Sequence, residues 1–208
     1  MTTKAHRIKL CWGIESGECP NLLIQEPTLK QDLESHIERS GWHELLGRSL
    51  SREIKPLDQF SISVSGCPNG CSRPQIADFG LLQATHPEVC GKACTGCGEC
   101  SRACREGAIE MLDGVAWIDP ESCLSCGVCL RACPEGALSP QMEGYRVQVG
   151  GKLGRHPRLG DELPGIQARD QMLKILKQCL ELHQKSYWPG RRFGQVVAEQ
   201  GILQLQPG

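Results

Sequence analysis

The sequence lacks a strong net charge, a long apolar run and an apolar leader. Its 208 residues carry a formal net charge of −1, so no broad basic field is available to attract nucleic acid or anionic lipid. No apolar run approaches the roughly 18 residues that a membrane helix needs. The first residues, MTTKAHRIKLCWG, lack the apolar core of a signal peptide. We therefore expect a cytoplasmic protein that binds neither nucleic acid nor membranes.

Cysteine, by contrast, is abundant. Fourteen cysteines without a secretion signal indicate metal ligation in a reducing compartment rather than disulfides. Eight of them form two runs of the pattern Cys-x2-Cys-x2-Cys-x3-Cys, separated by eighteen residues. This is the spacing of bacterial two-cluster ferredoxins, in which the fourth cysteine of each run ligates the other [4Fe–4S] cluster. Residues 88–140 therefore resemble such a ferredoxin domain.

The ferredoxin pattern assigns four cysteines to each cluster. One set is Cys94, Cys97, Cys100 and Cys133, and the other is Cys104, Cys123, Cys126 and Cys129. Two other uses of these cysteines fit the spacing less well. A zinc site usually takes two separated Cys-x2-Cys pairs, and a disulfide framework needs an oxidising compartment. The turn signal Asp113-Gly114 between two short alternating runs also predicts a hairpin inside this region.

The remainder of the chain predicts an α+β fold, a mixed sheet with helices on one side. Strands are expected around residues 6–14, 59–65, 76–82 and 144–149, and the clearest signal is the period-two alternation of residues 59–65. Helical periodicity marks residues 27–50, with an interruption at Gly41, and residues 166–185. On the apolar face of the second helix, Cys179 reads as a small buried hydrophobe and His183 as a core or rim residue.

Four of the remaining cysteines form a second pattern. Cys67-Pro-Asn-Gly-Cys71 follows a predicted strand, and its proline and Asn-Gly pair favour a constrained turn that holds two thiolates four residues apart. Alone, this pair could equally be two core cysteines. Together with Cys11 and Cys19 it supplies four thiolates, enough for a third iron–sulfur cluster. Cys90 has no assigned role.

These motifs resemble the nitrite/sulfite reductase family. Residues 1–87 and 141–208 resemble its sirohaem and [4Fe–4S] half, with the ferredoxin inserted at 88–140, as in small anaerobic sulfite reductases. The resemblance implies that Cys11, Cys19, Cys67 and Cys71 bind a third [4Fe–4S] cluster, and that Cys71 bridges it to sirohaem. One departure is the gap of seven residues between Cys11 and Cys19, where the family commonly has five.

The resemblance also implies sirohaem-binding and catalytic residues. The candidate sirohaem contacts are Cys71, Asn69, Arg73, Gly150, Gly151, Lys152, Arg155 and Arg158. The residues proposed to hold the substrate are Arg73, Lys9 and Lys152. Without this context, the segment from Gly150 to Arg158 would be interpreted as an ordinary basic hairpin loop.

The expected activity is sirohaem-dependent reduction of sulfite or nitrite, with electrons passing from the ferredoxin clusters through the third cluster. The expected partners are a small inorganic oxyanion and an electron donor protein or second subunit. Larger family members carry a further basic half, and we expect an oligomer. The missing charge would come from a second copy of the chain, from another subunit, or from this chain's own basic residues Lys4, Arg7, Lys9, Arg73, Lys152, Arg155 and Arg158. The alternative is an iron–sulfur electron-transfer protein or subunit without sirohaem or catalysis.

Overall fold

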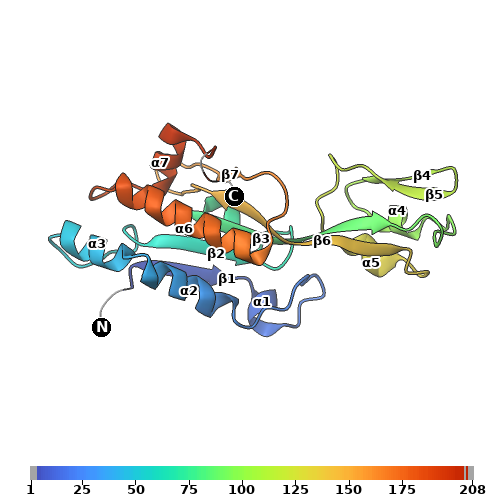
Figure 1. Cartoon of the computed structure of the whole chain (residues 1–208), viewed down its shortest axis with the longest axis horizontal. Helices are drawn as coiled ribbons and strands as arrows, with labels where there is room; N and C mark the ends of the chain where they lie inside the picture. Colours follow the sequence, from blue (N-terminus) through green and yellow to red (C-terminus); the bar gives the residue numbers. More distant parts are fainter. Residues whose placement is uncertain (1–3, 204, 206–208) are drawn as a thin grey trace.

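The computed structural model describes residues 4–203 and residue 205. A five-stranded sheet continues through two long strands into a smaller module at one end of the molecule (Figure 1). The strands of the sheet are β1 His6–Leu10, β2 Phe60–Ser65, β3 Phe79–Val89, β6 Leu138–Val149 and β7 Asp161–Glu162. The helices of this part are α1 Trp12–Ser16, α2 Leu29–Arg39, α3 Trp42–Ser49, α6 Arg169–Lys185 and α7 Phe193–Gln200, with a 3₁₀ turn, η1, at Pro74–Ile76. None of the described helices is long and apolar enough to span a membrane.

The sheet is mixed and has a different chemistry on each face. Its strand order is β1-β2-β3-β6-β7, with β1, β2 and β3 parallel and both pairs involving β6 antiparallel. Strand β2 reads Phe-Ser-Ile-Ser-Val-Ser, and successive side chains of a strand point to opposite faces. Its three apolar side chains belong to the main core, so its three serines point to the other face. This α+β arrangement is the fold class that the sequence predicts.

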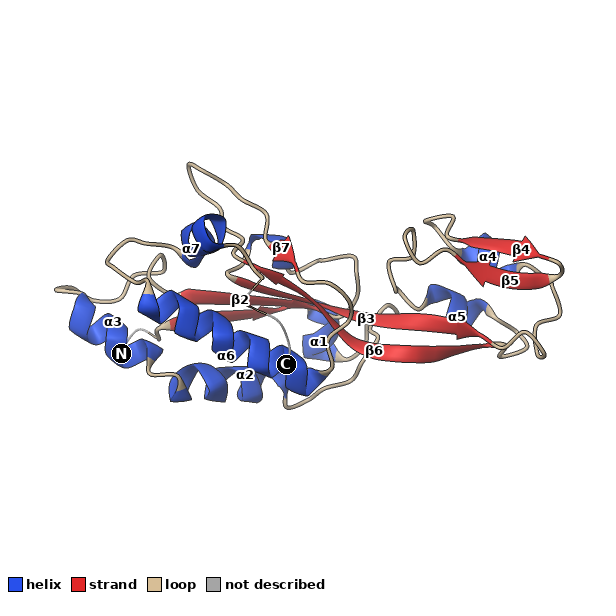
Figure 2. Cartoon of the chain, turned by 45° about the horizontal axis from the view of Figure 1, so that its top comes forward, coloured by secondary structure: helices blue, strands red, loops and turns tan. Residues whose placement is uncertain are grey.

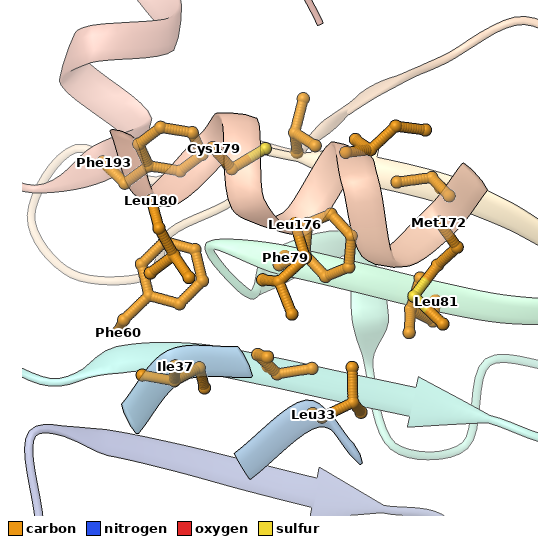
Figure 3. Close-up of a cluster of buried hydrophobic side chains, with 14 of the residues drawn as sticks. Leu33, Ile37, Phe60, Phe79, Leu81, Met172, Leu176, Cys179, Leu180 and Phe193 are labelled. Carbon is orange, nitrogen blue, oxygen red and sulfur yellow. The ribbon is translucent and has the colours of Figure 1, made fainter. Parts of the chain in front are cut away.

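The helices α2 and α6 cover the apolar face of the sheet and build the core with it (Figure 3). Cys179 on α6 is fully buried in this core, which confirms that it is a packing residue. Loss of a buried leucine from such a core costs roughly 2–5 kcal/mol. The core side chains labelled in Figure 3 are Leu33, Ile37, Phe60, Phe79, Leu81, Met172, Leu176, Cys179, Leu180 and Phe193.

Several predicted boundaries are corrected by the structure. The first strand ends at Leu10, because the chain turns at Cys11 into α1. Ile76 belongs to η1, whose first residue is a proline, and the strand that was expected at 76–82 runs from Phe79 to Val89. The predicted break at Gly41 is confirmed, since this glycine has φ 78° between α2 and α3.

The smaller module is carried by the long strands β3 and β6. They pair in antiparallel fashion from Phe79↔Val149 to Val89↔Leu138, with one irregularity between His86 and Pro87 (Figure 2). The predicted limits of the inserted domain, 88 and 140, therefore fall inside two hydrogen-bonded strands rather than in a loose linker. The elements of the module are α4 Glu99–Ala103, β4 Ile109–Leu112, β5 Val115–Ile118 and α5 Val128–Ala132.

His183 predicts a pH dependence of folding. Its ring stacks on Trp42 with centroids 4.5 Å apart, and burial lowers its pKa to about 4. The unfolded chain takes up this proton near pH 6.5, so between about pH 6.5 and 4 the unfolded state binds more protons and the free energy of unfolding falls as pH falls. The full loss should be roughly 3 kcal/mol at 1.36 kcal/mol per pKa unit.

Denaturant unfolding of the wild type and His183→Gln at several pH values between 7 and 4 measures this effect. Glutamine keeps a donor near the His183 Nε2, which lies 3.4 Å from the Arg191 carbonyl oxygen. The wild type should lose more stability on acidification than the variant. Parallel pH curves for the two proteins would refute the assignment, because all other acid-sensitive groups are shared.

Candidate functional site

Four cysteines from two regions of the sequence surround one small cavity at the end of β1 and β2. The cavity has a volume of about 110 Å³, and its lining includes Cys11, Cys19, Cys67 and Cys71. We call this group the sheet site. The Gly66 N–H donates to Cys11 Sγ over 3.2 Å, and the Cys11 N–H donates to the Val64 carbonyl over 2.9 Å. The structure thus brings together all four cysteines that the sequence assigns to the third cluster.

Helix α1 accommodates the seven-residue gap between Cys11 and Cys19. This five-residue helix folds the chain back, so that both thiols lie close to Gly13. A Cβ atom on Gly13 would stand 2.6 Å from Cys19 Cβ and 3.8 Å from Cys11 Sγ. Any side chain at this position would displace Cys19, so the glycine lets the longer gap close on the same cavity.

The environment of Cys67 determines its protonation. Burial raises the pKa of the Cys67 thiol, the Asn69 backbone N–H opposes this shift, and the neighbouring cysteines add to it. A thiol must lose its proton to ligate iron, so iron binding here releases protons. Within the described part of the chain, no three His, Cys, Asp or Glu side chains are arranged to hold one metal ion. The four sheet-site cysteines line one cavity.

Two further cysteine groups lie in the module. Cys104, Cys123, Cys126 and Cys129 line one small cavity, which we call the inner module site. The outer module site comprises Cys94, Cys97, Cys100 and Cys133. Three of these, all except Cys97, belong to an apolar cluster with parts of β4 and β5, which also includes Cys104 and Cys129 of the inner module site. Cys104, the fourth cysteine of the first run, thus lies with three cysteines of the second run in the inner module site.

Backbone N–H groups and burial act on these module thiols. The Ser125 N–H donates to Cys123 Sγ over 3.4 Å, and the Ala137 N–H donates to Cys133 Sγ over 3.3 Å. Such bonds favour the thiolate and are one means by which a protein tunes a cluster's potential. Burial raises the pKa of Cys129 to about 11 and also raises that of Cys100.

A larger cavity of about 650 Å³ lies on the serine face of the sheet. We call it the basic cavity, because four cationic side chains and one carboxylate line it: Arg7, Lys9, Arg73, Arg192 and Glu15. Ser61, Ser63 and Ser72 provide small polar wall groups. Its volume lies within the roughly 300–1,000 Å³ of ligand pockets. A large anionic ligand fits this lining.

The basic cavity and the sheet site are neighbours along three chain segments. Leu10 lines the basic cavity, and the next residue, Cys11, lines the sheet site. Likewise, Cys71 lines the sheet site, and the next two residues, Ser72 and Arg73, line the basic cavity. On β2, Ser63 faces the cavity and Ser65 the sheet site. Cys71 is exposed, and it lies in the sheet site directly before Ser72 and Arg73 of the basic cavity.

The structure separates the predicted sirohaem and substrate residues into two sets. Lys9 and Arg73 line the basic cavity, and Asn69 lines the sheet site. Arg73 has φ 65°, a conformation that is uncommon for a non-glycine residue and is often retained at functional sites. Its N–H donates to the Gly70 carbonyl over 2.8 Å, which holds the turn after Cys71 in place.

The second set belongs to the loop from Gly150 to Arg158, which borders the basic cavity through other residues. Among the described residues lining the basic cavity, this loop contributes Leu153 and Gly154 but not Lys152, Arg155 or Arg158. Arg158 forms an ion pair with Asp161 over 2.6 Å and donates to the Gly150 carbonyl over 3.0 Å. The glycine pair itself packs against the chain's own atoms. A Cβ on Gly151 would stand 2.5 Å from the Gln75 carbonyl, and one on Gly150 would stand 2.6 Å from Val197 Cβ.

Sequence reasoning missed Arg192 and the buried acid beside it. Arg192 precedes α7 and reaches the basic cavity, and its Nη2 lies 3.8 Å from Asp78 Oδ2. Burial raises the pKa of Asp78, while Arg192 and the Ser61 hydrogen bonds oppose this shift. In the sequence, only the pair Arg191-Arg192 before Phe193-Gly194 could have indicated a basic residue here. The fold is needed to show that Arg192 reaches the sheet.

Comparisons with known proteins agree with this geometry. The sequence model of the family described as the nitrite and sulphite reductase 4Fe-4S domain matches residues 14–206. The coenzyme F420-dependent sulfite reductase of Methanocaldococcus jannaschii is 42% identical over 127 residues, which are 61% of this chain and 20% of that protein. Protein MJ0551 of the same organism is 29% identical over 206 residues, covering 98% of this chain and 65% of its own length.

A solved structure shares the fold. The crystal structure of dissimilatory sulfite reductase I gives a TM-score of 0.59 at 17% identity, covering 98% of this chain and 52% of that one. The chain spans less than two thirds of the length of each of these three proteins.

Proposed function

Because this chain belongs to the nitrite and sulphite reductase 4Fe-4S domain family, we propose that it is a sirohaem- and iron–sulfur-dependent reductase of sulfite or nitrite, or the catalytic subunit of one. The observation that carries the proposal is the junction at Cys71, where a four-cysteine site meets a cavity with four cationic side chains. Sirohaem is rich in carboxylates, so the charge of this cavity suits it.

The proposed cofactors are three [4Fe–4S] clusters and sirohaem. The sheet site would hold the cluster next to the sirohaem, and the two module sites would hold the ferredoxin-type clusters. When bound, the sirohaem iron supplies an open coordination position at which an oxyanion can be reduced. The chain's own contribution is to bind the carboxylates of the tetrapyrrole and to hold the anionic substrate with Arg73, Lys9 and Arg192, whose positive charges would stabilise its negative charge.

A second chain is part of the same proposal. Leu57 and Leu153 line the basic cavity and are 70% and 58% exposed. An apolar rim around a charged cavity is typical of a surface that another chain covers. We propose that a second copy or another subunit covers this side and supplies further positive charge. An electron donor protein would deliver electrons to the module.

The competing function is electron transfer without sirohaem. The openness of the basic cavity to solvent at Leu57 and Leu153, and the absence of Lys152, Arg155 and Arg158 from its described lining, favour this alternative. The sulfite reductase among the relatives favours sulfite as the substrate, although this chain covers only 20% of that protein.

One anaerobic preparation tests the proposal. We expect about twelve cluster irons, four for each cysteine site, together with an extractable tetrapyrrole and its Soret and red absorption bands. Sulfite or nitrite should shift those bands. A holoprotein with eight or twelve irons and no tetrapyrrole would leave an electron carrier and refute the reductase.

A further inference from the structure

The loop at residues 21–24 connects the sheet site to the inner module site. The Leu23 N–H donates over 3.0 Å to the carbonyl of Gly66, the residue before Cys67. On its other side, Leu23 Cδ2 lies 3.2 Å from the position that a Cβ on Gly127 would take, and Gly127 follows Cys126. Leu23 therefore touches a neighbour of one cysteine from each site.

Strand β3 holds both ends of this connection. The side chain of Gln83, which is fully buried, accepts the Ile24 N–H over 3.1 Å and donates to the Ile24 carbonyl over 2.9 Å. Two residues further along, the Thr85 N–H donates to the Ser125 carbonyl over 2.8 Å, and Thr85 forms a parallel bridge with Cys126. Residues i and i+2 of a strand lie on one face roughly 7 Å apart. One stretch of β3 thus fixes the loop after Cys19 and the loop that carries Cys126.

The outer module site lies at the opposite side of the module. A Cβ on Gly96, between Cys94 and Cys97, would stand 2.8 Å from the Gly114 carbonyl. Gly114 is the turn of the β4–β5 hairpin, which lies at the far end of the molecule from the helices of the sheet (Figure 2). The two module sites are therefore not equivalent with respect to the sheet.

From this arrangement we propose that the inner module site is the last relay before the sheet site, and that Gln83 and Leu23 are positioning residues for that transfer. The inference rests on the proposed function, in which a low-potential donor protein supplies the electrons. In each transfer one electron would leave the reduced cluster of the inner module site and reduce the cluster of the sheet site, with no bond made or broken. Gln83 would fix the separation of the two cysteine sites, and Leu23 would occupy the space between the loops that carry them.

The first test replaces Gln83 by leucine, which removes both hydrogen bonds to Ile24 at similar volume. Gln148→Leu is the matched control, because Gln148 lies on the neighbouring strand β6 and donates to Glu162, away from the cysteine sites. Iron and sulfide content should stay at the wild-type value in both variants. The low-temperature electron paramagnetic resonance spectrum of the fully reduced protein should show changed spin–spin splitting in Gln83→Leu alone. Unchanged splitting in Gln83→Leu would overturn its positioning role.

The second test truncates Leu23 to alanine, which leaves the backbone hydrogen bond to Gly66 in place. Leu45→Ala, a partly buried leucine of α3, is the control. After anaerobic mixing with a donor protein, the tetrapyrrole absorption bands should change several-fold more slowly in Leu23→Ala than in wild type, at equal iron content. Equal rates in Leu23→Ala and wild type would overturn its role.

Failure of this inference and failure of the proposed function give different results. A wild type without the third cluster overturns both. A wild type with all three clusters and tetrapyrrole, but with unchanged splitting in Gln83→Leu and unchanged rates in Leu23→Ala, overturns the relay assignment alone. If Gln83→Leu loses iron, the Leu23→Ala measurement still decides.

Discussion

Replacing Cys71 by serine is expected to remove the third cluster and the sirohaem together, while the two clusters of the module remain. Cys71 lies where the sheet site meets the basic cavity, so its thiolate serves both groups in the proposed function. Serine keeps the shape of the side chain but is a much poorer ligand for iron, which is held by thiolates in such clusters. About four cluster irons and the sirohaem iron should be lost, together with all reductase activity.

The module provides the internal reference for this experiment. Seven of its eight cysteines, all except Cys97, lie in a cavity and an apolar cluster separate from the sheet site, so the absorption and electron paramagnetic resonance signals of the module clusters should persist at full intensity. Cys90→Ser is the matched control, since Cys90 is exposed and lies outside the three sites. Retention of the full iron content in Cys71→Ser would disprove the assignment of Cys71, and loss of iron in both variants would indicate a general effect of removing a thiol.

Replacing Arg73 by glutamine is expected to lower turnover of sulfite on the order of a hundredfold, as removal of one preorganised charge-stabilising donor does in other enzymes. Arg73 follows Cys71 closely, lines the basic cavity and is held in its turn by the Gly70 carbonyl. Glutamine has the same Cβ and Cγ atoms, so it meets the same backbone conformation at φ 65°. The change therefore removes the charge with little effect on the turn.

Steady-state kinetics and the tetrapyrrole content of the same samples test this prediction. The tetrapyrrole content of Arg73→Gln should equal that of the wild type. An unchanged content would show that Arg73 acts on the substrate and is not needed to bind the cofactor. Arg48→Gln on α3 removes an equal charge from an exposed side chain and should leave turnover unchanged. Arg73→Lys should recover part of the rate. If Arg73→Gln loses its tetrapyrrole instead, Arg73 binds the cofactor, and if it keeps full turnover, the side chain has neither role.

The grouping of the cysteines could be predicted from the sequence because it depends largely on local spacing. The two runs between Cys94 and Cys133, and the turn from Cys67 to Cys71, place thiols within a few residues of one another, and the fold brings these groups together. The seven-residue gap after Cys11 made the position of Cys19 hard to predict. The structure shows that Gly13, which has no side chain, leaves room for Cys19 beside Cys11.

The basic cavity could not be predicted in the same way, because its walls come from distant segments. Lys9 and Arg73 were identified through neighbouring cysteines, whereas Arg192 enters from the far end of the chain. The loop from Gly150 to Arg158 shows a further limit of sequence patterns. A glycine pair followed by basic residues is typical of ligand contact, but in this chain the glycines also allow the segment after β6 to pack against η1 and α7. Local pattern cannot distinguish a close approach to a ligand from a close approach to the chain's own backbone.

The pairing of Val89 with Leu138 has a consequence for how such a protein could have arisen. The two points at which the chain enters and leaves the module are directly opposite each other in one antiparallel ribbon, with Cα atoms roughly 5 Å apart as in any such pair. A tight turn could close that gap, so the ancestral sheet would have needed only an ordinary hairpin at this place. Exposed hairpin tips are the sites where insertions are best tolerated. A gene segment encoding a ready-made electron carrier could thus have been acquired in one event, without changing the register of any strand.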